Sequence, residues 1–298
     1  FTCLLLIFNV VLGSRIFGAK NWISLGPIGF QPSEFVKIGL IFFFSWFLQK
    51  NQEKINRPSV LVTAAVLAAV PLALILKQPD LSTSIVIVFF ILCLIYMAGI
   101  SYKWIAGALA VAVPSLALVV WLAEHNMMPF LEPYQINRIL AFINPGKYAE
   151  LNLQQDNSKM AIGSGRLYGK GLFNDTAISV KNGNFLSEEH TDFIFSVIGE
   201  ELGFIGCMIV LLLFLLFVFE CLRMASRARD MAGRLFCTGM AALVGFQSFT
   251  NIAVATGVFP NTGLPLPFIS YGVSSLASLY IGIGILLNVG LQQRKLEF

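Results

Sequence analysis

An acidic side chain, Asp192, stands where a long polar stretch meets an apolar one, in the segment HTDFIF at 190–195. A carboxylate at the edge of a membrane-spanning segment is costly to remove from water, so its default interpretation is functional, with a partner or an ion. Such a group can act as a general base, or it can hold a divalent cation against a phosphate. We therefore predict that Asp192 is the catalytic residue and also the candidate metal ligand.

A second polar group lies in the segment QPSEFVK at 31–37, where an apolar run begins. Pro32 suits the first turn of a helix, and Glu34 and Lys37 are then i,i+3 neighbours on one face of that helix. Two interpretations are open. Either the pair only neutralises itself at a membrane boundary, or it belongs to a functional cavity.

Two further segments are expected to support such a cavity. Asp80, in KQPDLST at 77–83, can accept backbone N–H bonds as the cap of the next helix, and we expect capping in preference to direct catalysis. The segment 260–267 (PNTGLPLP) carries three prolines, which break a helix at membrane depth. Non-helical backbone survives there only when it is buried in protein or lines a wet cavity. We predict an outward-facing cavity, with Ser270 among its supporting residues.

Basic residues and glycines occur together in the longest polar region. Glycine-rich backbone beside cations suits a phosphate group, through exposed N–H donors and charge-assisted hydrogen bonds. The predicted pyrophosphate ligands are Arg138, Lys159 and Arg166, beside Gly163, Gly165, Gly169 and Gly171. The Gly-Lys pair at 169–170 lacks the spacing of a nucleotide-binding P-loop, so nucleotide hydrolysis is excluded.

The composition is that of an integral membrane protein. Of the 298 residues 57% are hydrophobic and 12% are charged, whereas soluble domains carry roughly 25% charged residues. Apolar runs of about 20 residues can cross a ~30 Å hydrocarbon core. The sequence predicts an all-α polytopic fold with eight spans, near 1–13, 34–49, 58–76, 81–100, 103–123, 193–220, 235–258 and 266–291.

The distribution of Lys and Arg predicts the orientation of these spans. Basic clusters follow the second, fourth, sixth and eighth spans, so they share one side, and Lys/Arg excess marks the cytoplasm. The region 124–191 is therefore expected to be a large extracytoplasmic loop within a single domain, 1–298. A basic stripe with interleaved aromatic residues is lacking, so no nucleic-acid partner is expected. The five cysteines have no CxxC spacing and predict neither a disulfide nor a zinc site.

Five motifs in order resemble one known family. They are GAKNWISLGP with QPSEFVK (18–37), QPDLSTS (78–84), NSKMAIGSGRLYGKGL (157–172), HTDFIFSVIGEELGFIG (190–206) and GLPLPFISYGVSS (263–275). The chain resembles the SEDS family (shape, elongation, division and sporulation), typified by RodA, FtsW and SpoVE, and looks nearer to RodA-like or sporulation-type members. The resemblance implies ten helices, with the large loop between the seventh and the eighth. The resemblance therefore implies that two N-terminal helices are missing here. The start at Phe1, inside an apolar run with no signal peptide, separately leads us to expect that the N-terminus is lacking.

The resemblance also implies an activity and its partners. The resemblance implies a peptidoglycan glycosyltransferase. Such an enzyme joins lipid II to an undecaprenyl pyrophosphate-linked glycan at the outer face of the bacterial cytoplasmic membrane. It works with a class B penicillin-binding transpeptidase. The matched motifs imply that Asp192 is catalytic and that Glu34 and Lys37 are needed in a central cavity. The predicted cofactor is Mg²⁺ or Mn²⁺.

Two alternative functions remain open. A lipid II flippase would also use broken helices and charges within the membrane, but it should place them near the midplane. Asp80, Asp192 and the long loop are instead expected on one outer surface, which favours an enzyme. A structural scaffold for a transpeptidase would leave Asp192 without a role.

Overall fold

The fold is described from a computed structural model that covers most of the chain. The described residues are 2–12, 14–16, 19–25, 28–78, 80–124, 133–144, 146–172 and 190–292. They form two compact units. Unit one comprises 1–100, 213–247 and 272–298, and unit two comprises 101–212 and 248–271. The prediction of a single domain stays a prediction.

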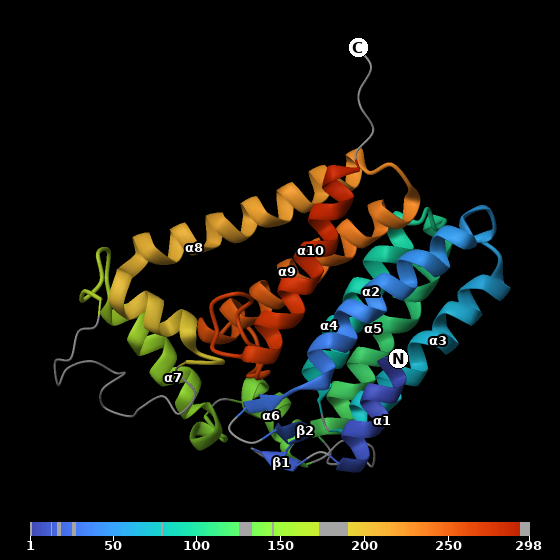
Figure 1. Ribbon diagram of the computed structural model, residues 1–298. Helices are drawn as coiled ribbons and strands as arrows, with labels where there is room; N and C mark the ends of the chain where they lie inside the picture. Colours follow the sequence, from blue (N-terminus) through green and yellow to red (C-terminus); the bar gives the residue numbers. More distant parts are fainter. Residues whose placement is uncertain are drawn as a thin grey trace. The chain divides into compact units, whose positions relative to one another are not determined.

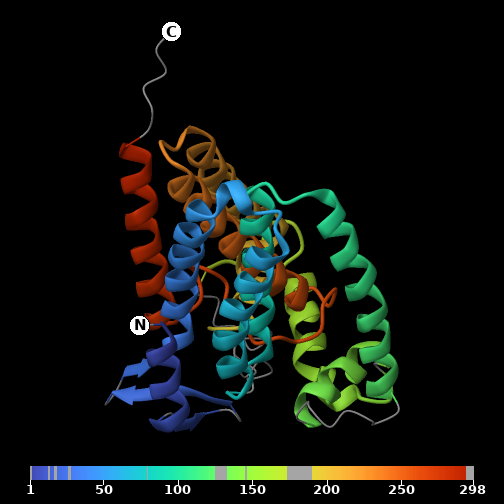
Figure 2. The same ribbon diagram turned by 90° about the vertical axis from the view of Figure 1, so that its right-hand side faces the viewer.

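Unit one is built around helix α2 (Pro32–Lys50), which packs against α1 (Thr2–Leu12), α4 (Leu81–Met97) and α10 (Val273–Leu291). Pro32 stands at the start of α2, where its missing N–H costs nothing. Side chains of α2 are buried on most of its faces, as a helix surrounded by others requires. α4 packs against both α2 and α3 (Pro58–Leu76), and these three helices can be followed in Figure 1. Figure 2 shows α10 beside α2. A short 3₁₀ turn, Gln52–Lys54, lies between α2 and α3.

A small antiparallel sheet corrects the all-α prediction. Its strands are β1 (Ser14–Ile16), β2 (Ala19–Leu25) and β3 (Ile28–Phe30), in the order β1-β2-β3. Ile23 pairs with Phe30 across the β2–β3 ladder. Aromatic and β-branched residues favour strands, and Gly-Pro follows β2 in the sequence, as is typical of a turn. Strands this short carry too little apolar periodicity to stand out beside membrane-spanning runs.

Unit two contains α5 (Tyr102–Glu124), α6 (Pro133–Ile143), α7 (Ala149–Ser164), the first part of α8 (Ile194–Arg227) and the end of α9 (Met231–Ala255). In its described part, the region predicted as a loop, 124–191, holds the helices α6 and α7. The apolar pattern missed α7 because its buried face carries polar residues, such as Gln155 and Ser158.

Polar side chains of α7 form hydrogen bonds with the C-terminal end of α9. The last carbonyls of a helix lack partners within it and must be satisfied from outside. Gln155 Nε2 donates to the carbonyl oxygens of Val254 (2.8 Å) and Phe259 (2.7 Å), and Ser158 Oγ donates to that of Ala255 (2.7 Å). α7 thereby holds the C-terminus of α9 through specific hydrogen bonds.

The break predicted from the prolines is present. Residues 256–272 are not helical, and α10 begins at Val273 rather than at 266. The predicted spans at 58–76 and 193–220 correspond to α3 and to most of α8. α8 contains a kink at Gly203, whose backbone has φ 67° and ψ −164°.

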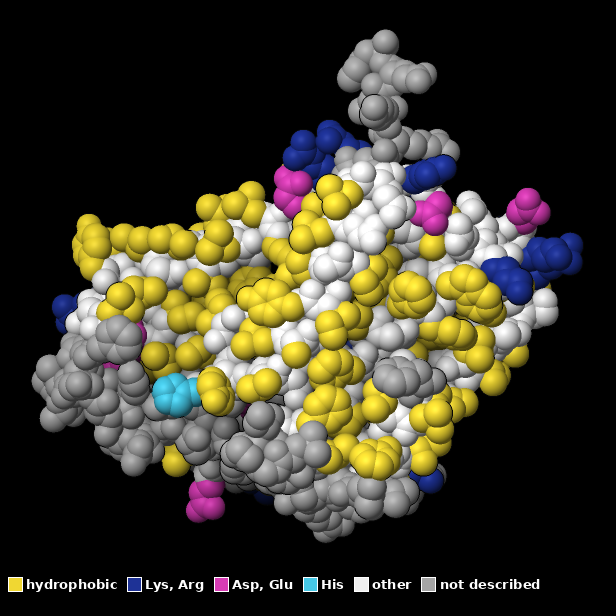
Figure 3. Space-filling model, viewed as in Figure 1, with side chains coloured by type: hydrophobic (Ala, Val, Ile, Leu, Met, Phe, Trp, Pro, Cys, Tyr) yellow, Lys and Arg dark blue, Asp and Glu magenta, His cyan; other side chains and the backbone are white. Residues whose placement is uncertain are grey.

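Among the described residues, four helices are long and apolar enough to cross a membrane: α3, α8, α9 and α10. α4 is a shorter apolar helix. Apolar side chains along α8, including Leu212, Leu213 and Phe219, are more than half exposed, which suits a lipid environment. The yellow row of side chains at the upper left of Figure 3 follows this helix. The chain is a multi-pass membrane protein.

Candidate active site

Asp192 lies in a turn that leads directly into α8. The next residue, Phe193, is 1% exposed and packs in a cluster with Ala161 and Val254, against which Phe259 also packs. Burying a phenylalanine side chain contributes about 1.5–3 kcal/mol, so this residue anchors the turn. Asp192 itself is half-buried. The sequence places a carboxylate next to a strong hydrophobic anchor, and the anchor limits where the carboxylate can be.

The backbone of the turn is tied to two segments that follow later in the chain. Asn251 Nδ2, from α9, donates to the carbonyl oxygen of Asp192 (2.8 Å) and to that of Leu264 (2.7 Å). Tyr271 N donates to the carbonyl oxygen of His190 (2.9 Å). Bonds on both sides of Thr191 fix the position of Asp192 from its backbone, independently of its carboxylate.

Ser270, predicted as a supporting residue, takes part in the same frame. Its Oγ donates to the carbonyl oxygen of Thr191 (2.6 Å) and accepts a hydrogen bond from Leu266 N (2.7 Å). The side chain is buried, at 3% exposure. One hydroxyl therefore joins the turn at 190–193 to the proline-rich segment.

Asn251 was missed by the sequence analysis. It is 1% exposed and stands on α9 in the polar run QSFTN at 247–251, inside an otherwise apolar helix. A buried polar group is costly unless it is hydrogen-bonded, so polar residues in a spanning helix point to partners. This polar run is the sequence signal from which Asn251 could have been predicted.

Arg138 reaches the same place as Asp192. Gly263 has φ +71°, and a Cβ built on it would lie 3.3 Å from Asp192 Oδ2 and 3.9 Å from Arg138 Nη1. The Arg138 Nη1 atom also donates to the carbonyl oxygen of Asn261 (3.1 Å). The structure thus brings the predicted base and one predicted pyrophosphate ligand to one point, which a glycine leaves open.

The other two predicted pyrophosphate ligands make different contacts. Lys159 forms an exposed i,i+3 ion pair with Asp156 (2.6 Å), and its aliphatic chain lies against Gly257. Arg166 is exposed, and its carbonyl oxygen accepts a hydrogen bond from Phe204 N. Their role towards a pyrophosphate stays a prediction.

The glycines of the same region serve a purpose that was not expected. The backbone N–H groups at 165, 166, 169, 170 and 171 all donate to carbonyl oxygens of the protein. A backbone cradle for a phosphate needs free N–H donors, and these five are occupied. Close approach of two backbones explains Gly165 and Gly169 instead, because a Cβ on either would clash with the backbone of α8, whereas a Cβ on Gly163 or Gly171 would meet nothing within 4 Å.

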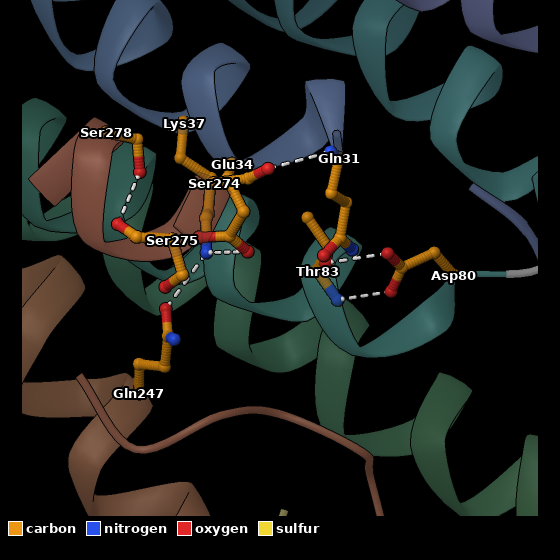
Figure 4. Close-up of polar contacts among 9 residues, drawn as sticks. All are labelled: Gln31, Glu34, Lys37, Asp80, Thr83, Gln247, Ser274, Ser275 and Ser278. Atoms are coloured by element: carbon orange, nitrogen blue, oxygen red, sulfur yellow. Dashed lines mark hydrogen bonds and ion pairs between the residues drawn. The ribbon is translucent and has the colours of Figure 1, made fainter. Parts of the chain in front are cut away.

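Unit one carries the second predicted group, shown in Figure 4. Lys37 Nζ lies 2.8 Å from Glu34 Oε1 and 3.0 Å from Gln247 Oε1. The side chains of Lys37 and Glu34 are only 2% and 3% exposed. Two charges at this depth need each other, because an isolated buried charge is strongly unfavourable. Gln247, also missed from sequence, gives the ammonium a second acceptor.

Asp80 performs the predicted capping role. Its two carboxylate oxygens accept from Thr83 N (3.0 Å) and Thr83 Oγ1 (2.8 Å) at the start of α4. The same view shows Gln31 N donating to Ser274 Oγ, and that hydroxyl donates to the carbonyl oxygen of Gly29. The start of α10 is thereby tied to the start of α2.

A family model described as "Cell cycle protein", for FtsW, RodA and SpoVE, matches residues 1–295. The chain belongs to this family, the SEDS proteins. A probable peptidoglycan glycosyltransferase FtsW of Trichlorobacter lovleyi is 38% identical over 288 residues, which are 96% of this chain and 72% of that SEDS relative. The peptidoglycan glycosyltransferase MrdB of Escherichia coli K12 is 34% identical over 301 residues, with 99% and 77% covered.

The chain is also similar to a solved structure. A chain of a peptidoglycan synthase complex, studied for the coordination of polymerization and crosslinking, superimposes with a TM-score of 0.76 at 32% identity. The match covers 97% of this chain and 78% of that chain. Relatives with the FtsW name and with the MrdB name have similar identities, so the position within the SEDS family, nearer to RodA-like or sporulation-type members, stays a prediction.

Replacing Ser270 by Ala is expected to lower the free energy of unfolding by about 1–3 kcal/mol, because Leu266 N and the Thr191 carbonyl lose a buried partner. Thermal unfolding in detergent measures the change. Ser226→Ala is the matched control, since that hydroxyl is exposed and bonds only within its own helix turn. Equal stability of the two variants would contradict a framing role for Ser270.

Proposed function

We propose that this chain is a peptidoglycan glycosyltransferase that polymerises lipid II at the outer face of the bacterial cytoplasmic membrane. The observation that carries the proposal is the placement of Asp192, in a SEDS chain, beside Arg138 and within a frame made by Asn251 and Ser270. The curated relatives are named peptidoglycan glycosyltransferases, which supports the enzyme over the lipid II flippase.

The proposed chemistry is a displacement at a sugar carbon. Asp192 takes the proton of the acceptor 4-hydroxyl on the GlcNAc of lipid II as this oxygen attacks the anomeric carbon of the growing glycan. The bond between that carbon and the pyrophosphate oxygen breaks, and undecaprenyl pyrophosphate leaves with the bonding electrons. A base held by its backbone keeps its position when the carboxylate gains the proton.

The leaving pyrophosphate develops negative charge, and a cation aimed at that charge lowers the barrier. Arg138 is the first candidate, because it and Asp192 approach the same point at Gly263. Lys159 and Arg166 are further candidates. The guanidinium of Arg138 can offer two parallel N–H donors to a phosphate, which suits recognition of this leaving group.

Mg²⁺ or Mn²⁺ is the proposed cofactor. Among the described residues, no three His, Cys, Asp or Glu side chains gather to hold a metal ion. Mg²⁺ is often bound by one or two carboxylates together with phosphates of the substrate, so Asp192 with a pyrophosphate is a sufficient donor set. When bound, such a cation would neutralise charge on the pyrophosphate.

The finer topology and the partner belong to the same proposal. We expect eight spans in this chain, with the region 124–191 outside the cytoplasm, where lipid-linked sugars are polymerised. The similarity to a chain of a peptidoglycan synthase complex supports a class B penicillin-binding transpeptidase as the partner. The same similarity supports the cytoplasmic membrane as the location of this protein.

The test uses the full-length protein with its candidate transpeptidase, labelled lipid II and Mn²⁺. We expect ladders of glycan strands on a gel. Lipid II that crosses proteoliposome membranes without forming ladders would overturn the proposal in favour of the flippase.

A further inference from the structure

We propose that the segment 165–171 is a backbone clamp that holds the kink of α8 and thereby positions Asp192, with Lys170 and Glu200 as its positioning residues. This inference rests on the proposed function, because its consequence is read in the polymerisation rate. All of the residues involved lie in unit two.

The clamp replaces hydrogen bonds that the kink removes. In a regular α-helix the N–H of residue 204 would donate to the carbonyl of residue 200, and that of 205 to 201. Instead, Phe204 N donates to the Arg166 carbonyl (2.8 Å) and Ile205 N donates to the Leu167 carbonyl (3.2 Å). Each freed N–H of α8 therefore finds an acceptor in the clamp.

The freed carbonyls are satisfied from the same segment. The Glu200 carbonyl accepts from Lys170 N (2.9 Å), and the Glu201 carbonyl accepts from Gly171 N (3.0 Å). Two broken helical bonds are thus exchanged for four bonds to the clamp. Without the clamp, these four groups would lack partners at the kink, which is costly wherever water is scarce.

Glycines make this approach sterically feasible. A Cβ on Gly169 would lie 2.1 Å from the Glu201 carbonyl oxygen, and a Cβ on Gly203 would lie 2.3 Å from Gly169 N. Both residues have positive φ, +79° and +67°. No other residue type fits at either position without moving one backbone away from the other.

An ion pair between side chains adds to the backbone bonds of the clamp. Lys170 Nζ lies 2.6 Å from Glu200 Oε1, and the side chain of Glu200 is only 3% exposed. A buried carboxylate depends on its cation far more than a surface one does. Glu200 belongs to the same short helical stretch that begins at Ile194, two residues after Asp192.

The consequence for Asp192 follows from the break in the helix. The stretch before Gly203 is not joined to the rest of α8 by a continuous hydrogen-bond ladder, so its direction is set by what it packs against. Ile162 of α7 lies against Gly199, and Ser158 and Ser196 share a hydrogen bond. The clamp adds the constraint at the kink itself. A displacement of about 1 Å at a reacting group can cost about 10²-fold in rate.

Hydrogen exchange and kinetics on the full-length protein test the clamp. Gly169→Ala is expected to accelerate amide exchange at Phe204 and Ile205 by at least about tenfold, since the clamp bonds open while the global fold persists. It should lower kcat for lipid II polymerisation by about 10²-fold with KM changed less than about twofold, because the base is displaced while substrate binding is kept. Lys170→Ala should act in the same direction, and Lys170→Arg should restore most of kcat.

Gly146→Ala is the matched control, because a Cβ there meets open space and both readouts should stay unchanged. Unchanged exchange at Phe204 and Ile205 in Gly169→Ala would overturn the clamp. Faster exchange with wild-type kcat would overturn its positioning role. A wild-type protein that forms no glycan would instead refute the proposed function, and the positioning role with it, and exchange alone would then decide whether the clamp exists.

Discussion

An Asp192→Asn protein is expected to fold normally and to polymerise lipid II about 10²–10⁴-fold more slowly than the wild type, which is the usual contribution of a general base. The amide has nearly the same shape as the carboxylate but cannot take the proton of the acceptor hydroxyl. The backbone carbonyl of residue 192, which accepts from Asn251, is unchanged by the substitution. The frame around the turn should therefore survive.

Glycan ladders and thermal unfolding, measured on the same preparations, check this result. Glu150→Gln is the control, because Glu150 is an exposed acid of α7 in the same unit. It should lose neither activity nor stability. An Asp192→Asn protein that is folded and makes ladders at the wild-type rate would remove Asp192 from the chemistry and leave the base unassigned.

The second large effect is expected at the buried ion pair of α2. Lys37→Met should lower the free energy of unfolding by about 3–5 kcal/mol, because it leaves the Glu34 carboxylate buried without its cation. The double variant Glu34→Gln with Lys37→Met should recover most of this loss, since neither charge then remains buried. Unfolding in detergent gives both values.

The exposed pair Glu220–Arg223 offers a matched control with the same i,i+3 spacing. Its side chains are about half exposed, at 49% and 48%, and breaking it should cost no more than about 1 kcal/mol. Similar losses for the two pairs would contradict the account based on burial.

The double variant also separates the two interpretations of the buried pair. A folded double variant that polymerises lipid II normally would mean that Glu34 and Lys37 only neutralise each other. Restored stability without polymerisation would mean that the pair serves the reaction, as the family resemblance implies.

Much of the candidate site could be predicted from local sequence signals. Asp192 stood out because a carboxylate beside an apolar run is costly to remove from water. Asp80 stood out because an Asp just before an apolar run can accept the free backbone N–H groups of the next helix. The i,i+3 spacing of Glu34 and Lys37 predicted their contact, which the structure confirms at 2.8 Å. Signals of this kind reach only a few residues along the chain.

Contacts between segments far apart in the sequence could not be predicted from such local signals. Asn251 and Ser270 meet the turn at 190–193 only because α9 and the segment after it fold back onto that turn. Gln247 reaches Lys37 from more than two hundred residues away. The helix α7 escaped detection because its buried face is polar, and those polar groups find partners only in the folded unit.

The sequence by itself determined the membrane class, the family, the break after α9 and the acid at the start of α8, because hydropathy, proline chemistry and ordered motifs are properties of the chain. Only the tertiary structure decided what the glycines at 165–171 do. Their composition suggested a phosphate cradle, but the backbone N–H groups at 165, 166, 169, 170 and 171 all donate to protein carbonyls, and those of Lys170 and Gly171 donate to the kinked α8. Every backbone N–H is chemically the same donor, so the sequence does not specify which carbonyl it binds. The acceptor depends on which segment packs close to it in the folded protein.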